Sequence, residues 1–390
     1  MKIGMLDPAN LTPFYTYALC DGLVNIGHKL TCYSTRYDND PGLRPPVSVE
    51  FIDHYFQYFR KLQSHGPRKL RKVIRGISYL PGHRSLLRKL LKDKPDVVHI
   101  QWARLPILDG YFIRALQRAG IPVVLTVHDV DPFFSFGGDH LLTLLYNRVD
   151  HLIVHHSSAV SVLRDRFNVK DTAKISVIPH GPLQSENIPK NKTRDDARRA
   201  LGIPKSANVI TFFGEIKYYK GLDILIDAVV KAADNVPDLY LLMAGKPERL
   251  EDIPDISILK GKNISHHTNF SFIPNDEVWR YYLAANIVAL PYRQISQSGV
   301  LFSALAHERF TVCSDVGGLP ELIEMVGGGK IIPKESVAKL AATITMLFKK
   351  KDRLDIEAQK ARIKLLDLCS WNRISKLTQN VYAKVTCMKP

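Results

Sequence analysis

Two lysines follow a strongly apolar segment in the second half of the chain, and they are the first candidates for chemistry. The segment reads Phe212-Phe-Gly-Glu-Ile-Lys-Tyr-Tyr-Lys-Gly221: a predicted strand ends at a turn containing Gly214 and is followed by Lys217 and Lys220. Ligands of parallel α/β sheets bind outside the carboxyl ends of the strands. Two lysines at that edge would form a cationic site for phosphate groups, although two ordinary surface lysines would give the same pattern.

A second predicted strand ends in Leu290-Pro-Tyr-Arg-Gln-Ile-Ser-Gln-Ser-Gly-Val300, where a polar loop leads into a helix. The first N–H groups of a helix lack partners within it and lie at the positive end of its dipole. The N–H groups of Ser298, Gly299 and Val300 are therefore candidates for binding an anion. Many helices begin after Ser-Gly without binding a ligand, and both interpretations stay open.

The third such segment is Val312-Cys-Ser-Asp-Val-Gly-Gly-Leu-Pro-Glu-Leu322, with two glycines between a predicted strand and a predicted helix. The pair permits a close approach of the backbone to a ligand, and packing alone is the alternative explanation.

In the first half, Leu125-Thr-Val-His-Asp129 places His128 directly after a buried strand. A histidine at this edge could hydrogen-bond a sugar hydroxyl or transfer a proton. A structural role is the alternative, because His155, His156 and His180 follow other predicted strands in the same way.

Other kinds of site have little support. The sequence has no G-x-G-x-x-G and no Walker motif, which argues against a dehydrogenase or a kinase. The acidic pairs Asp38/Asp40 and Asp129/Asp131 have no convincing third ligand, so no catalytic metal is predicted.

Short apolar strands alternate with amphipathic helical stretches throughout, as in parallel sheets covered on both faces. The predicted strands are 3–6, 29–33, 97–102, 123–127, 152–155 and 175–178, then 209–213, 239–244, 264–270, 287–291, 311–314 and 330–332. The predicted helices are 16–26, 107–119, 221–233, 276–285, 300–306, 319–325 and 371–385.

Two such series in 390 residues predict an α/β chain with two Rossmann-like domains. We expect a first domain over residues 1–185, a second over 186–370, and a helix over 371–390 that packs on the first. The polar segment 184–199 is the predicted linker.

A net charge of +16 and a pI near 9.5 call for an anionic partner. Much of this charge is concentrated in residues 60–94, where twelve Lys or Arg face one acid, Asp93, and alternate with apolar residues. A basic amphipathic stretch suits docking on an anionic membrane surface, and a solvated helix face is the alternative. Few aromatic residues interleave and no nucleic-acid-binding motif is present, so nucleic acid is not the expected partner.

The five cysteines form no C-x-x-C pair, which suits a reducing compartment. Neither a secretory segment nor an apolar run long enough to cross a membrane is evident, so a cytoplasmic location is expected, with peripheral contact at the inner face of the membrane.

Taken together, six segments resemble the retaining GT-B glycosyltransferases of family 4, and the resemblance covers nearly the whole chain. They are Asp96–Gln101, Leu125–Asp129, Ile178–Gly181, Phe213–Asp223, Ser314–Glu321 and the final helix from Ser370-Trp371 through Tyr382.

The resemblance implies a nucleotide-sugar donor as co-substrate and no other cofactor. Lys217 and Lys220 would face the diphosphate together with the amides of 298–300, and the base would lie near Phe272 and Ile273. His128 would reach the donor sugar from the first domain, which would hold a glycan or lipid-linked acceptor. Positioning and charge stabilisation at the leaving diphosphate would then supply most of the catalysis.

The sequence departs from the family in places that matter. The usual pair of glutamates, eight positions apart, is absent, and the first of them falls on Ile295 or a neighbour. Ser303 stands where the family carries the glutamate that holds the donor ribose, and Glu215 stands where many members carry an arginine for the diphosphate. A serine cannot offer the two carboxylate oxygens that grip a ribose diol. A non-catalytic sugar-nucleotide-binding or scaffold protein is therefore the alternative to a transferase, and a GT-B epimerase, which would need carboxylates facing the sugar, is a third.

Overall fold

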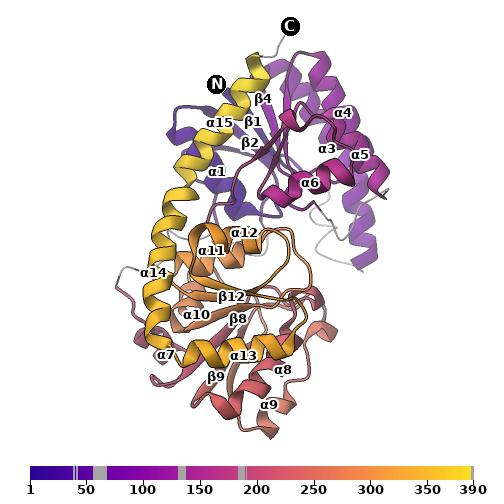
Figure 1. Ribbon diagram of the computed structural model, residues 1–390. Coiled ribbons are helices and arrows are strands. Elements are labelled where there is room, and N and C mark those ends of the chain that lie inside the picture. The colour runs from indigo at the N-terminus through magenta and orange to yellow at the C-terminus, as the bar shows by residue number, and fades with distance from the viewer. Residues whose placement is uncertain are drawn as a thin grey trace. The chain divides into compact units, whose positions relative to one another are not determined.

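The computed structural model describes residues 1–37, 40, 43–55, 68–130, 138–182, 189 and 191–387, and in helix α3 the side chains only from Tyr79 onward. The chain divides into two compact units, Met1–Pro179 with Trp371–Pro390, and His180–Ser370 (Figure 1). Half of the expected basic stretch, residues 60–67 and the side chains of 68–78, lies outside the described part.

The first unit is built on a seven-stranded parallel sheet in the order β3-β2-β1-β4-β5-β6-β7. Its strands are β1 Lys2–Asp7, β2 Lys29–Ser34, β3 Glu50–Asp53, β4 Val97–Ile100, β5 Val123–Thr126, β6 His151–Val154 and β7 Ile175–Val177. Its helices are α1 Pro13–Asn25, α3 Arg68–Asp93, α4 Pro106–Arg118, α5 Gly138–Arg148, α6 Ser157–Asp165 and α15 Trp371–Cys387.

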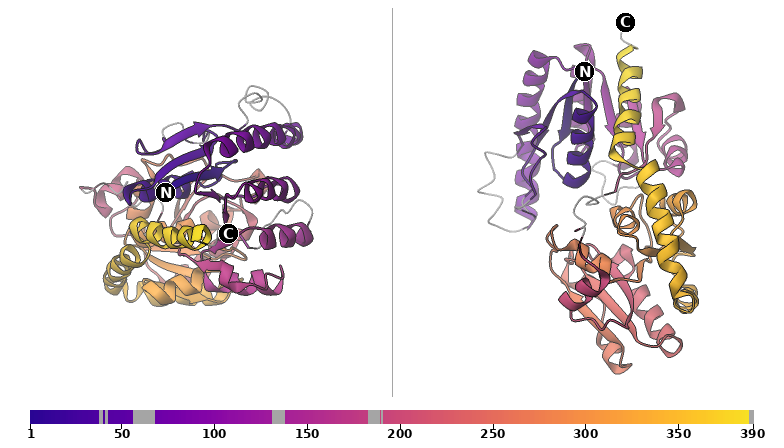
Figure 2. Two further views of the ribbon diagram at one scale, coloured as in Figure 1. Left: turned by 90° about the horizontal axis from the view of Figure 1, so that it is seen from above. Right: turned by 90° about the vertical axis from the view of Figure 1, so that its left-hand side faces the viewer.

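Helices cover both faces of this sheet. Helices α3, α4 and α5 lie side by side over one face (Figure 2), and their apolar residues share a core with those of α6. Helix α15 packs against α1 on the other face. This contact is close at Gly22, where an added Cβ would lie 2.3 Å from Ser375 Oγ.

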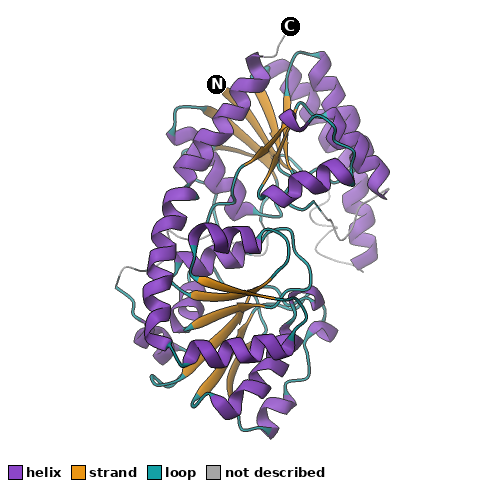
Figure 3. Cartoon of the chain, viewed as in Figure 1, coloured by secondary structure: helices purple, strands orange, loops and turns teal. Residues whose placement is uncertain are grey.

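The second unit is built on a six-stranded parallel sheet in the order β10-β9-β8-β11-β12-β13 (Figure 3). Its strands are β8 Asn208–Phe213, β9 Leu239–Ala244, β10 Ser265–Asn269, β11 Ile287–Leu290, β12 Phe310–Ser314 and β13 Gly329–Ile332. Its helices are α7 Arg194–Ala200, α8 Leu222–Ala232, α9 Ser257–Gly261, α10 Val278–Ala284, α11 Gly299–Ala306, α12 Leu319–Val326, α13 Val337–Phe348 and α14 Lys351–Leu368.

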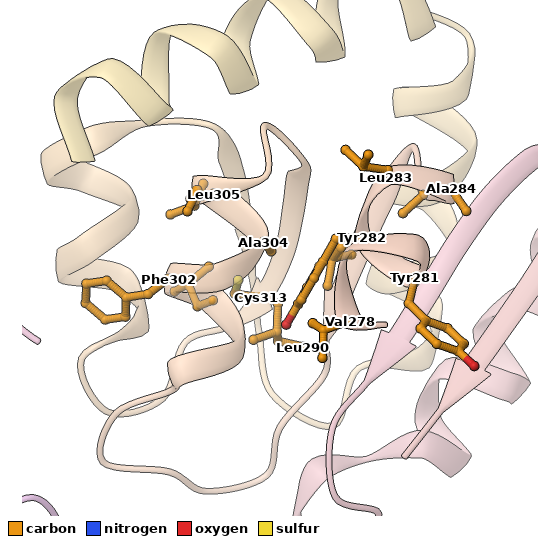
Figure 4. Close-up of a cluster of buried hydrophobic side chains, with 14 of the residues drawn as sticks. Val278, Tyr281, Tyr282, Leu283, Ala284, Leu290, Phe302, Ala304, Leu305 and Cys313 are labelled. Carbon is orange, nitrogen blue, oxygen red and sulfur yellow. The ribbon is translucent and has the colours of Figure 1, made fainter. Parts of the chain in front are cut away.

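The core on one face of this sheet fixes α11, the helix that follows the second predicted ligand loop. Figure 4 shows Phe302, Ala304 and Leu305 of α11 in a cluster with Tyr282 of α10 and with Leu290 and Cys313 of the sheet. Because these side chains are buried, the first turn of α11 is held at the carboxyl edge of the strands.

The predicted α/β class with two Rossmann-like sheets is confirmed. The predicted elements are incomplete, because strand β3 and the helices α5, α6, α7, α9, α13 and α14 are absent from them. Strand β3 was missed, because it is a short, partly exposed edge strand. The predicted linker 184–199 already contains the start of α7, whose first turn is closed by a capping box between Thr193 and Asp196.

Candidate functional site

The candidate site of the second unit lies where its sheet changes direction. From β8 the chain adds β9 and β10 on one side, and it then adds β11, β12 and β13 on the other. The loops after β8 and β11 therefore diverge at a topological switch point, which is the usual position of ligands in open α/β sheets. The first two sequence-predicted segments are these two loops.

Glycines let the loop after β8 pack closely against the loops after β9 and β11, with no side chain between the backbones. Gly214, with φ +108°, follows β8, and a Cβ on Gly245 after β9 would lie 1.9 Å from the Gly214 carbonyl oxygen. A Cβ on Gly221 would lie 2.1 Å from the carbonyl oxygen of Pro291. The turn that carries the two lysines is thus set directly on the ends of β8 and β11.

Lys220 lies at the centre of this arrangement. Its Nζ is 3.3 Å from the Cβ position of Gly214, and Cγ2 of Val300 is 3.1 Å from the same point. The ammonium also lies 5.9 Å from the ring centroid of Tyr292. Among the described residues Lys220 belongs to no ion pair, and burial lowers its pKa to about 8. The predicted residues Gly214, Lys220 and Val300 are therefore brought together around a cation that forms no ion pair within the described ranges, although the charge of Glu215 opposes the effect of burial on its pKa.

Lys217 lies in the same loop but has two carboxylate neighbours. Its Nζ lies 3.0 Å from a carboxylate oxygen of Glu215 and 3.7 Å from one of Glu248. Burial by itself would lower the pKa of Lys217, but the two carboxylates raise it above its ordinary value. The charge of Lys217 is thus partly neutralised by Glu215.

Arg293 was missed by the sequence reasoning, although it lies in the loop that follows β11. Its guanidinium binds both carboxylate oxygens of Asp223, at 2.9 and 2.5 Å, and stacks 4.1 Å from the ring centroid of Tyr218. It also donates to the carbonyl oxygen of Tyr218 at 2.8 Å. These contacts clamp the single turn Tyr218–Lys220 to the end of β11. Arg293 therefore holds the turn that presents Lys220.

The first turn of α11 contributes backbone groups. Ser298 is its N-cap residue and makes no side-chain cap hydrogen bond. Its hydroxyl instead bonds to Tyr292, and its N–H donates to Oε1 of Gln297 at 3.1 Å. The N–H groups of Gly299 and Val300 begin the helix and point out of its amino end.

The other residues predicted to bind the nucleotide sugar have different surroundings. Ser303 is buried in α11, and its hydroxyl bonds to Tyr282. Ile273 packs in the core, whereas Phe272 is 37% exposed. The Gly317–Gly318 pair serves packing between loops, because a Cβ on Gly317 would lie 2.0 Å from the carbonyl oxygen of Ile295.

In the first unit, His128 lies at the carboxyl end of β5 among aromatic rings. Its Nε2 is 2.9 Å from Oε1 of Gln101, and its Nδ1 is 3.1 Å from Nε2 of His155. The ring of Trp102 stacks on it with the centroids 4.8 Å apart, and Tyr15 contacts it edge-on at the same distance. These neighbours fix the orientation of His128.

The two other candidate histidines have partners of their own. His156 contacts the hydroxyl of Ser158 at 2.8 Å. His180 belongs to the second unit, where it packs on Phe302, and burial lowers its pKa to about 4.

No cluster of three or more His, Cys, Asp or Glu side chains arranged to hold a metal ion occurs among the residues described. None of the described helices combines the length and the apolar character needed to cross a membrane.

A glycine pair gives a direct test of the packing at the lysine turn. Gly221 and Gly202 both have φ +67°, but an added Cβ would meet Pro291 at Gly221 and nothing within 4 Å at Gly202. Gly202→Ala should cost about 1–2 kcal/mol of unfolding free energy, from the left-handed backbone alone. Gly221→Ala should cost about 1–3 kcal/mol more, from the clash. Equal losses in urea unfolding would contradict the close packing.

Two family models match successive parts of the chain. Glycosyltransferase Family 4 matches residues 14–181, and Glycosyl transferases group 1 matches residues 193–364. Among curated relatives, the D-inositol 3-phosphate glycosyltransferase of Corynebacterium glutamicum is 30% identical over 228 residues, which are 54% of this chain and 54% of the relative.

Two solved structures show the same fold. The sucrose-phosphate synthase of Thermosynechococcus elongatus aligns with a TM-score of 0.77 at 18% identity, covering 99% of both chains. HepE of Anabaena, solved with UDP-glucose, aligns with a TM-score of 0.70 at 14% identity, covering all of both chains.

The chain therefore belongs to the family 4 glycosyltransferases and has the GT-B fold. Its matches span 58% and 54% of the length of two of its curated relatives.

Proposed function

We propose that this protein transfers a sugar from a nucleotide-sugar donor to a glycan or lipid-linked acceptor with retention of configuration and without a metal. The main support is the environment of Lys220, a partly buried ammonium beside Gly214 and the first turn of α11, at the switch point of the second sheet. A helix amino terminus and a lysine are the groups that bind phosphate in such positions. The second unit would bind the donor, and the first unit would bind the acceptor.

In this mechanism the protein stabilises the leaving diphosphate. Lys220 and the N–H groups of Gly299 and Val300 would take up the charge that develops on the phosphate as the glycosidic bond breaks. His128 would contact the donor sugar from the first unit. The acceptor hydroxyl would attack from the face that the diphosphate leaves, and a diphosphate oxygen would help to remove the hydroxyl proton.

A second candidate function is nucleotide-sugar binding without transfer. It is favoured by the pairing of Lys217 with Glu215 and Glu248, which weakens the cationic site, and by the buried position of Ser303. Binding would then be measurable while the donor stays intact.

A transfer assay separates these functions. The protein is incubated in EDTA with radiolabelled UDP-, GDP- and ADP-sugars and a total lipid and glycan extract, and the product anomer is determined by NMR. We expect one donor to be consumed and its anomeric configuration to be kept. Donor binding without consumption would favour the second function, and activity that is lost in EDTA would contradict a metal-independent site.

We also propose that the first unit contacts the inner face of an anionic membrane through the basic stretch 60–94. In the described part of α3, Leu80, Arg84 and Arg88 are exposed at a spacing of four residues, so they share one face. The neighbouring α4 exposes Ile107 and Tyr111. Apolar groups beside cations suit an interface with anionic lipid headgroups.

Charge reversal on this face should weaken vesicle binding. The triple variant Arg84→Glu, Arg88→Glu, Lys92→Glu should bind vesicles containing phosphatidylglycerol at least about a hundredfold more weakly, since each basic residue contributes about 1 kcal/mol near such a surface. The matched control is Lys231→Glu, Lys349→Glu, Lys350→Glu in the second unit, which changes net charge equally. Equal loss in both variants would argue for a non-specific charge effect and against this face.

The lowered pKa of Lys220 predicts how donor affinity depends on pH. Only the protonated ammonium attracts the diphosphate, so affinity should be full well below pH 8 and fall as pH rises through about 8. The fall should approach tenfold per pH unit. Calorimetric titration with a nucleotide sugar measures it, because its diphosphate does not titrate in this range. Lys220→Arg should give a flat profile, since the guanidinium stays charged; a flat wild-type profile would contradict the assignment.

A further inference from the structure

Two histidines at the ends of the adjacent strands β5 and β6 form a hydrogen-bonded pair with an oxygen at each end. His155 Nδ1 lies 3.0 Å from the carbonyl oxygen of Ile178, and His155 Nε2 lies 3.1 Å from His128 Nδ1. His128 Nε2 then lies 2.9 Å from Oε1 of Gln101. Both rings are buried, with exposed fractions of 5% for His155 and 9% for His128.

The chemistry of the two end groups determines how many protons the pair holds. The carbonyl oxygen of Ile178 can only accept, so His155 Nδ1 must carry a proton; Gln101 Oε1 can also only accept, so His128 Nε2 must carry one. The contact between the two inner nitrogens needs a third proton, because two lone pairs would repel. Two neutral imidazoles hold two such protons in total. A pair with three carries one positive charge.

The orientation of Gln101 is supported by the opposite end of its amide. Its Nε2 lies 3.1 Å from Sδ of Met5 and 3.3 Å from Nε2 of His99. Burial lowers the pKa of His99 to about 3, so this ring is neutral, and its Nε2 also lies 2.7 Å from the hydroxyl of Thr126. The reversed amide would point its carbonyl oxygen at the Met5 sulfur, and the structure places Oε1 of Gln101 toward His128.

The surroundings also suit a cation. Trp102, after β4, stacks on His128, and a ring face attracts a positive charge. Tyr15 of α1 contacts both histidines edge-on, at 4.8 and 5.3 Å between centroids, and Trp371 of α15 packs against Tyr15.

We propose that His128 and His155 together hold one extra proton at neutral pH, and that His155 is the positioning residue that keeps a proton on Nδ1 of His128. The pair would then supply a fixed positive charge and a transferable proton at the carboxyl edge of the first sheet. Its use in sugar transfer rests on the proposed function, whereas its protonation does not.

The protonation is measured directly by long-range ¹H–¹⁵N correlation NMR on the full chain labelled with ¹⁵N-histidine. At pH 7 we expect the pair to show three protonated ring nitrogens, and to lose one proton in a single step as pH rises. Two neutral rings, each with one protonated nitrogen at pH 7, would overturn the proposal.

Variants assign the extra proton to the two end contacts. His155→Phe keeps the ring but removes the acceptor for Nδ1, and Gln101→Met removes the acceptor for Nε2. Either change should leave His128 singly protonated at pH 7. Gln101→Glu keeps an acceptor oxygen, so His128 should stay protonated on both ring nitrogens in this variant. His151→Phe, at the amino end of β6 and bonded to Ser176, is the matched control. An unchanged His128 spectrum in both His155→Phe and Gln101→Met would also overturn the proposal.

Kinetics provide a separate readout if transfer is established. His155→Phe should shift the basic limb of the pH profile of kcat by at least about one pH unit relative to the His151→Phe control, because the proton on His128 is lost earlier. An unshifted profile with a reduced rate would indicate a merely structural role. Absence of transfer with every donor would contradict the proposed function and leave the NMR result as the test of the pair.

Discussion

Replacing Lys220 by methionine should lower kcat/KM for sugar transfer by about 10²–10³-fold, the usual cost of removing one group that stabilises developing charge. Methionine keeps most of the length and apolar surface of the lysine side chain. The turn Tyr218–Lys220, which packs against Arg293 and Pro291, should therefore persist. The charge beside Gly214 and the first turn of α11 would be lost.

Lys217→Met is the matched control for this variant, because both lysines belong to the same loop. Lys217 already shares its charge with Glu215 and Glu248, so its loss should cost about tenfold or less, as expected for a partly exposed ion pair. Steady-state kinetics with the identified donor measure both. A larger loss in Lys217→Met than in Lys220→Met would reverse the roles assigned to the two lysines.

The second large effect is expected at His128. His128→Phe keeps a ring between Trp102 and Tyr15 but removes both nitrogens, and kcat should fall by about 10²–10⁴-fold if the imidazole acts on the sugar or on a proton. The dissociation constant of the nucleoside diphosphate, measured by calorimetry, should change little, because that ligand is assigned to the other unit.

A control for the loss of a buried histidine is His151→Phe, at the opposite end of a neighbouring strand. It should leave kcat within about threefold of the wild type, the range of an ordinary substitution away from a site. A loss of less than tenfold in His128→Phe would show that His128 is structural.

The fold class could be predicted from the sequence because buried strands appear in it as unbroken apolar runs. Strand β9 runs Leu239–Ala244, as predicted, and each of its residues is buried, so an unbroken apolar run was the expected signal. Strand β3 gave no such signal, because none of its residues is buried. The start of α7 was hidden in a polar segment whose capping box, Thr193 with Asp196, could have been recognised.

The site could be predicted where its parts share one loop or follow adjacent strands, as Val300 does after β11. Lys220 and Gly214 lie on the same loop, and their proximity follows from local chain geometry. The partners that decide the charges come from distant segments: Glu248 follows β9, and Asp223 meets Arg293 across 70 residues of sequence. Pairing of this kind depends on which strands are neighbours and on loop conformation, which residue spacing does not encode.

The most direct test of the donor site compares thermal unfolding of the wild type and Lys220→Met with UDP-, GDP- and ADP-sugars in EDTA. A ligand at about one hundred times its dissociation constant stabilises by about 2.7 kcal/mol, which raises Tm by several degrees for domains of about this size. We expect such a rise for one nucleotide class in the wild type, and a much smaller rise in Lys220→Met. No rise with any nucleotide sugar, or an equal rise in both proteins, would contradict a donor site built around Lys220.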